Sequence, residues 1–171
     1  MNIQLVDLKK QYLTIRHEID DAIQSVINET AFIKGKYVSE FESAYAKAIG
    51  VKHCISVANG TDAIYISLKA LGIGPGDEVI TVANSWISTS ETISQTGAKP
   101  VFVDIDPATF TINPTLIEEK INKHTKAIIP VHLFGHPCDM STIMDISKKH
   151  NLSVIEDCAQ SHLAEFNDQK V

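Results

Sequence analysis

The feature that most constrains this 171-residue chain is the regular alternation of short apolar runs with helical patterns after residue 50. The apolar runs predict strands at 53–57, 78–82, 101–104, 126–131 and 152–156. Helical patterns cover 61–71, 86–96 and 140–150, and Asn113-Pro114 is typical of a helix start. Strands that alternate with helices form a parallel sheet with helices on both faces. The sequence therefore predicts an α/β fold, a three-layer sandwich around a mainly parallel sheet.

The first 50 residues lack strand patterns, and apolar side chains recur there at helix spacing over residues 15–27. Ser39 and Glu42 have the spacing of a capping box, which predicts that a second helix begins at Ser39. Gly50 is a stop signal and predicts that this helix ends near Ile49.

Composition excludes several classes of protein. The formal net charge is -6 and Arg16 is the sole arginine, so the chain has no basic surface for nucleic acid or for an anionic membrane. No apolar run is long enough for a signal sequence or a spanning helix. The cysteines, Cys54, Cys138 and Cys158, are odd in number and widely spaced, which indicates free thiols and a cytoplasmic location.

Two segments follow predicted strands where an open parallel sheet binds its ligands, beyond the carboxyl ends. In the first, Gly60 and Thr61 open a helix, whose free N–H groups and dipole favour an anion. An ordinary N-cap turn without a ligand remains the alternative. In the second, Asp157 could pair with a cationic ring nitrogen and Gln160 with another polar atom of the same ligand. The alternative for Asp157 is a plain helix cap.

Trp86, the only tryptophan, follows another predicted strand on the same edge of the sheet. A flat indole there could stack on a planar ligand, and a core position is the alternative. The glycines of 72–76 resemble a dinucleotide-binding fingerprint, but they follow a helix rather than a strand and predict a turn. A Rossmann-type nucleotide binder is therefore poorly supported.

A metal site is the less favoured interpretation of the histidine and cysteine pattern, because no tight pairing of ligands accompanies it. The residues concerned are His132, His136, Cys138, Cys158 and His162.

Five motifs follow one another in an order that resembles the DegT-type sugar aminotransferases, which belong to fold type I of the pyridoxal-phosphate enzymes. These motifs occupy residues 59–63, 71–80, 99–105, 125–135 and 155–162. The resemblance covers essentially the whole chain. It implies an N-terminal helical segment at 1–35 and, at 36–171, an incomplete large domain that binds the cofactor.

The resemblance also implies a role for each candidate residue. Gly60 and Thr61 would hold the phosphate of pyridoxal 5'-phosphate, and Trp86 would stack on its ring. Asp157 would pair with the pyridine nitrogen, and Gln160 would bind near the phenolic oxygen. The implied reaction moves an amino group, usually from glutamate, to a keto group of a nucleotide-linked sugar. The products would serve surface polysaccharides or other amino-sugar pathways, and the intact family forms homodimers.

Two departures from the family pattern are evident. The Schiff-base lysine would lie beyond this chain, so we expect no catalytic residue within it and no activity from it alone. Leu163 stands where the family usually has glycine after His162, which would strain the turn if that position needs a glycine conformation. The alternative function is a non-catalytic fragment that binds pyridoxal phosphate or pairs with a full-length homologue.

Overall fold

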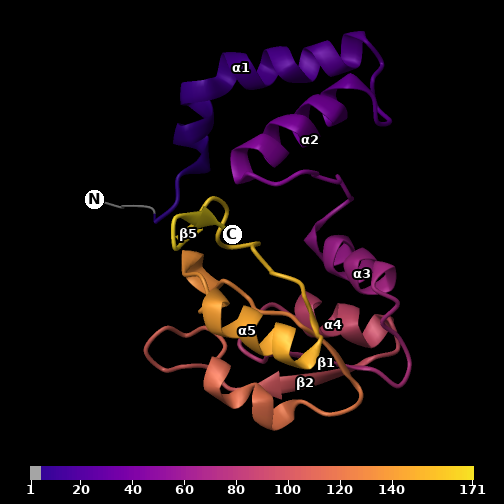
Figure 1. Cartoon of the computed structure of the whole chain (residues 1–171). Helices are drawn as coiled ribbons and strands as arrows, with labels where there is room; N and C mark the ends of the chain where they lie inside the picture. The colour runs from indigo at the N-terminus through magenta and orange to yellow at the C-terminus, as the bar shows by residue number, and fades with distance from the viewer. Residues whose placement is uncertain (1–4) are drawn as a thin grey trace. The chain divides into compact units, whose positions relative to one another are not determined.

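The computed structural model describes residues 5–171, and the chain divides into two compact units, Met1–Ser56 and Val57–Val171. The first unit contains the two helices that the sequence predicts, α1 at Leu8–Asn28 and α2 at Lys36–Ile49 (Figure 1). Asp7 caps α1 by accepting a hydrogen bond from the Lys10 amide at 2.9 Å.

The predicted start of α2 is wrong by three residues. The helix begins at Lys36 after Gly35, so the Ser39 amide already donates to the Gly35 carbonyl, at 3.1 Å. Glu42 does not complete a capping box, because its Oε1 accepts from the Ser56 amide at 2.8 Å. The predicted end is confirmed, since Gly50 is the C-cap of α2.

The second unit is built on a four-stranded parallel sheet in the order β2-β1-β3-β4, which confirms the predicted α/β class. The strands are β1 (Glu78–Val82), β2 (Lys99–Val103), β3 (Thr125–Ile128) and β4 (Ser153–Val154). The helices are α3 (Gly60–Ala70), α4 (Ser88–Gln95) and α5 (Met140–His150). Each strand ends at the same edge of the sheet, because all pairs are parallel.

Successive side chains of the central strands enter two separate cores. Val79 of β1 packs with Ala127 in the cluster that α3 and α4 cover. Ile80 and Ile128 face the opposite side, in the cluster that α5 covers. Helices therefore lie on both faces of the sheet, and the three-layer arrangement follows from strands that are apolar on both faces (Figure 1).

Two predicted elements are wrong. Residues 53–57 form no strand, because no neighbouring strand pairs with them and the Ile55 side chain is 81% exposed. Asn113 does cap a helical turn, accepting from the Thr115 amide at 3.1 Å. The segment that follows consists of two short 3₁₀ turns, η1 (Pro114–Leu116) and η2 (Glu118–Lys120), rather than an α-helix. A third, η3, spans Leu133–Gly135.

The last residues form a hairpin of β5 (Glu165–Phe166) and β6 (Gln169–Lys170). Asn167 and Asp168 connect the strands with φ of 50° and 60°, the positive values of a tight hairpin turn. Within residues 5–171, no helix is both long enough and apolar enough to cross a membrane.

Candidate functional site

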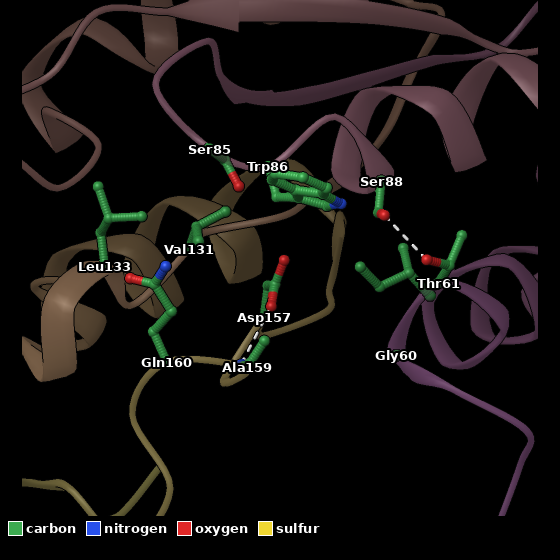
Figure 2. A pocket seen from close by; sticks show the side chains of 11 residues that line it. Gly60, Thr61, Ser85, Trp86, Ser88, Val131, Leu133, Asp157, Ala159 and Gln160 are labelled. Atoms are coloured by element: carbon green, nitrogen blue, oxygen red, sulfur yellow. Dashed lines mark hydrogen bonds between the residues drawn. The ribbon is translucent and has the colours of Figure 1, made fainter. Parts of the chain in front are cut away.

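The carboxyl ends of three strands and the start of one helix enclose a cavity of about 320 Å³, within the usual range for small-molecule sites. All five residues predicted from the sequence line it: Gly60, Thr61, Trp86, Asp157 and Gln160 (Figure 2). They come from segments up to 100 residues apart, so the fold of the second unit alone brings them together.

The first wall of the cavity is the N-terminus of α3. Asn59 is the N-cap and accepts from the Asp62 amide at 2.8 Å. The amides of Gly60 and Thr61 precede the first helical hydrogen bond, so no carbonyl of the helix can accept from them. The Thr61 hydroxyl lies 2.8 Å from the Ser88 hydroxyl of α4 (Figure 2). Two amides and two hydroxyls therefore converge where the helix dipole favours an anion.

Trp86 is 77% exposed and lines the cavity, which excludes the alternative of a core tryptophan. It lies in the loop after β1, two residues before α4. Figure 2 shows the indole on the side of the cavity toward which the Asp157 carboxylate points. An exposed aromatic face over a cavity can stack on a planar ring.

Asp157 follows β4 and extends its pairing, because the Asp157 amide donates to the Pro130 carbonyl at 2.9 Å. The carboxylate accepts from two groups: Oδ1 from the Ala159 amide at 3.2 Å, and Oδ2 from the Thr89 hydroxyl at 3.1 Å. No helix follows Asp157 among the described residues, so it is not the plain helix cap of the alternative interpretation. The half-buried carboxylate is held in place and faces the cavity.

Gln160 has its amide group oriented by the backbone. Its Oε1 accepts from the Phe134 amide at 2.8 Å. This bond identifies the oxygen end of the amide and leaves the Nε2 donor for other partners. Gln160 therefore offers a hydrogen-bond donor at the cavity, suited to an oxygen atom that carries negative charge.

A buried histidine joins the segments that follow β3 and β4. His132 is fully buried; its Nδ1 accepts from the Cys138 amide at 3.0 Å, and its Nε2 lies 3.0 Å from Glu156 Oε2. The first bond places the ring proton on Nε2, which then donates to Glu156. Both nitrogens are engaged, so His132 is not available as a metal ligand. Across residues 5–171, no group of three or more His, Cys, Asp or Glu side chains is placed to hold a metal ion.

The thiol beside the site is held in its neutral form. Burial, with the charges of Glu156 and Asp157, raises the pKa of Cys158 to about 12. A thiol with that pKa is not a nucleophile near neutral pH. No lysine lines the cavity among the described residues, so the chain presents no amine there.

Six further lining residues were not predicted from the sequence: Ile64, Ser85, Ser88, Val131, Leu133 and Ala159. For Ser85 and Ser88 a signal did exist, because hydroxyl residues are dense from 85 to 92, directly after β1. The apolar lining residues carry no such signal, since Val131 resembles any other buried strand residue.

The glycine segment 72–76 lies outside this cavity. It follows α3, and the Asp77 amide donates to the Gly74 carbonyl at 3.0 Å, which makes it the turn before β1 that the sequence predicts.

A family model described as the DegT/DnrJ/EryC1/StrS aminotransferase family matches residues 13–171. Among the relatives, the chain is 47% identical over 171 residues to the "Pleiotropic regulatory protein" of Geobacillus stearothermophilus. It is 47% identical over 168 residues to the UDP-2-acetamido-2-deoxy-3-oxo-D-glucuronate aminotransferase of Pseudomonas aeruginosa. These matches cover 100% and 98% of the chain but 46% and 47% of the relatives. The chain thus spans about half the length of the relatives it matches.

Solved structures agree with these sequence matches. DesV of S. venezuelae, in complex with a ketimine intermediate, superposes with a TM-score of 0.97 at 37% identity, over 99% of this chain and 46% of that one. The ntda protein of Bacillus subtilis, with bound cofactor PMP, gives a TM-score of 0.80 at 41% identity, over 85% and 34%. The DesV match covers nearly the whole chain, so it includes residues of both units.

Proposed function

The chain belongs to the DegT/DnrJ/EryC1/StrS aminotransferase family, and on that premise we propose that it forms the cofactor-binding part of a sugar aminotransferase that uses pyridoxal 5'-phosphate. The reaction would transfer an amino group, from a donor such as glutamate, to a keto sugar linked to a nucleotide. A relative named as an aminotransferase of a UDP-linked oxo sugar supports this substrate class. The observation that carries the proposal is the meeting of all five predicted residues in one cavity.

The chemistry of the cavity fits the cofactor at each of its polar positions. The Gly60 and Thr61 amides, with the hydroxyls of Thr61 and Ser88, would hold the phosphate. The Asp157 carboxylate would hold the proton on the ring nitrogen. Gln160 would donate to the phenolic oxygen, because its own oxygen is already engaged by Phe134.

The chain's residues would orient the cofactor rather than react with it. The bound cofactor supplies an electron sink for the carbon that carries the amino group. Trp86 would cover one face of the ring and limit its tilt, and Asp157 would keep the ring nitrogen positively charged. No lysine lines the cavity in the described part of the chain, so we propose that the Schiff-base lysine lies outside residues 1–171.

Membership of the family also suggests a cellular location, an oligomeric state and a pathway. We propose a cytoplasmic homodimer that serves surface polysaccharide or amino-sugar biosynthesis. The alternative is a non-catalytic module that binds pyridoxal phosphate or pairs with a full-length homologue. The absence of lysine from the cavity lining, among residues 5–171, favours this alternative for the chain by itself.

Cofactor binding can be tested through the single tryptophan. We expect pyridoxamine 5'-phosphate, which needs no lysine, to quench Trp86 fluorescence saturably in the purified chain. NAD should not. Asp157→Asn should weaken binding about tenfold or more, because the charged partner of the ring nitrogen is lost. Asp145→Asn, at an exposed position on α5, is the matched control and should leave binding unchanged. Quenching by NAD alone, or by neither ligand, would refute the proposal.

A second measurement separates the enzyme from the module. The chain is incubated with pyridoxal 5'-phosphate, reduced with borohydride and analysed by mass spectrometry. We expect no single lysine to be labelled in residues 1–171. A product that extends through a lysine-bearing continuation should be labelled there and should aminate a nucleotide-linked keto sugar. A labelled product without aminotransferase activity would favour the non-catalytic module.

A further inference from the structure

Most hydroxyl side chains of α4 are bonded within the helix itself. A serine or threonine in a helix commonly donates to a carbonyl three or four residues earlier. This is the behaviour of Ser90, Thr92, Ser94 and Thr96. Hydroxyls bonded in this way donate to backbone carbonyls of their own helix, and none of these four residues lines the cavity.

Thr89 departs from this pattern. Its side chain is 1% exposed, and its hydroxyl leaves the helix to donate to Asp157 Oδ2, 68 residues further along the chain, at 3.1 Å. The same Oγ1 lies 3.0 Å from the Ser85 hydroxyl. A hydroxyl has one proton, and Thr89 donates it to the carboxylate, so Ser85 is the donor in the bond between the two hydroxyls. The three residues form a directed chain of hydrogen bonds from the loop after β1 to the carboxylate.

We propose that Thr89 is a positioning residue that fixes the Asp157 carboxylate for its cofactor partner, an inference that rests on the proposed function. Thr89 occupies one carboxylate oxygen and the Ala159 amide occupies the other. The carboxylate cannot rotate without losing one of these bonds. Each oxygen keeps a lone pair for a partner in the cavity.

The bond also fixes the direction in which the carboxylate faces the cavity. A carboxylate held opposite a ring nitrogen favours the protonated form of that ring. Because Thr89 is buried, water cannot replace its hydroxyl if the side chain is changed. Ser88, its neighbour, holds Thr61 at the anion end of the cavity. One turn of α4 therefore supports both ends of the proposed ligand.

The test uses pyridoxamine 5'-phosphate labelled with ¹⁵N in the ring, bound to the chain. Thr89→Val preserves the shape of the side chain and removes the hydroxyl. We expect it to weaken binding about 10-fold to 100-fold, followed through Trp86 fluorescence, because a hydrogen bond to a charged group is lost. The ¹⁵N resonance should also move toward that of the unprotonated ring. Thr89→Ser restores the hydroxyl and should restore both values.

Thr92→Val is the matched control. Thr92 is fully buried on the same helix, but its hydroxyl donates to the Thr89 carbonyl, at 3.2 Å, and not toward the cavity. It should lose stability without a shift of the ¹⁵N resonance. Should Thr89→Val fail to fold, Ser85→Ala carries the test, since it removes the donor to Thr89 and should shift the resonance in the same direction by a smaller amount.

The outcomes distinguish the two proposals. An unmodified chain that does not bind pyridoxamine 5'-phosphate refutes the proposed function, and this inference with it. If the unmodified chain binds but Thr89→Val leaves the ¹⁵N resonance and the affinity unchanged, the role of Thr89 alone is refuted. If Thr89→Val does not fold, the same result for Ser85→Ala refutes it. A resonance shift of equal size in Thr92→Val would show that the effect arises from packing, and would also overturn it.

Discussion

Leu163 holds a backbone conformation that side chains rarely adopt. Its φ is 64°, in the left-handed region, and its side chain is 51% exposed, so packing contributes little there. A non-glycine residue in this region costs roughly 1–2 kcal/mol. The sequence predicts strain here if the position needs a glycine conformation, and the positive φ shows that it does. The strain arises from the Cβ of Leu163, three residues after Gln160.

Leu163→Gly should therefore stabilise the chain. We expect a gain of about 0.5–1 kcal/mol in the free energy of unfolding, because relief of strain exceeds the extra freedom of glycine in the unfolded state. Urea unfolding measures it. Leu71→Gly is the control, since Leu71 is 48% exposed but has a φ of -78°. That variant should lose about 0.5–1 kcal/mol. A loss at Leu163 would show that no strain is stored there.

The Cys138 thiol links stability to alkaline pH. Burial raises the pKa of Cys138 from 9.0 to about 11. The folded state keeps the proton more firmly, so this stabilisation is complete below pH 9 and is lost as pH rises toward 11. We expect unfolding free energy to fall by about 2 kcal/mol more in the unmodified chain than in Cys138→Ala between about pH 8 and pH 10.5. Parallel pH dependences in urea titrations would contradict it.

The sequence allows site residues that follow strand ends to be predicted. It does not allow this for residues, such as Thr89, that contact them from a neighbouring helix. Asp157 and Trp86 were found because parallel strands share one ligand-binding edge. Thr89 was not found, since its role depends on the rotation of α4 and on a partner 68 residues away. A local pattern of residues shows neither the rotation of a helix nor a partner so far along the chain.

At the scale of elements, prediction succeeded where local signals agree with burial. α5 spans Met140–His150 as predicted, with Asp139 as a bonded N-cap and Asn151 ending it in the left-handed conformation. The segment 53–57 failed because an apolar run becomes a strand only when a neighbouring strand pairs with it. Local composition does not contain that information.

The turn between α4 and β2 is set by one glycine. Gly97 has a φ of 88°, and a Cβ built there would lie 2.8 Å from Pro75 Cγ, in the turn before β1. A proline ring cannot swing aside as a flexible side chain does. The two turns therefore pack together only with glycine at this position.

Gly97→Ala should destabilise the second unit through both strain and contact. Gly76→Ala is a close control, with a φ of 92° and nothing within 4 Å of the added carbon. We expect about 1 kcal/mol of destabilisation for Gly76→Ala. Gly97→Ala should lose a further 1–3 kcal/mol or so through overpacking. Equal losses in thermal or urea unfolding would mean that Pro75 moves away freely.

At the scale of the whole molecule, the two units differ in what holds them together. In the second unit, two apolar clusters fill both faces of the sheet and every lining residue of the cavity lies between Gly60 and Gln160. In the described part of the first unit, residues 5–56, Ala46 alone is buried. Helices without a buried face gain little from packing, and isolated helices are marginal in water.

Residues 57–171 expressed alone should consequently unfold cooperatively and bind pyridoxamine 5'-phosphate within about threefold of the full chain, since no lining residue is removed. Residues 1–56 alone should show helical circular dichroism that fades gradually on heating, because no core links the melting of α1 to that of α2. Circular dichroism and Trp86 fluorescence measure both. If folded 57–171 lost more than about tenfold in affinity, the helical unit would stabilise the cavity. That result would contradict the expectation drawn from the lining residues, which all belong to 57–171.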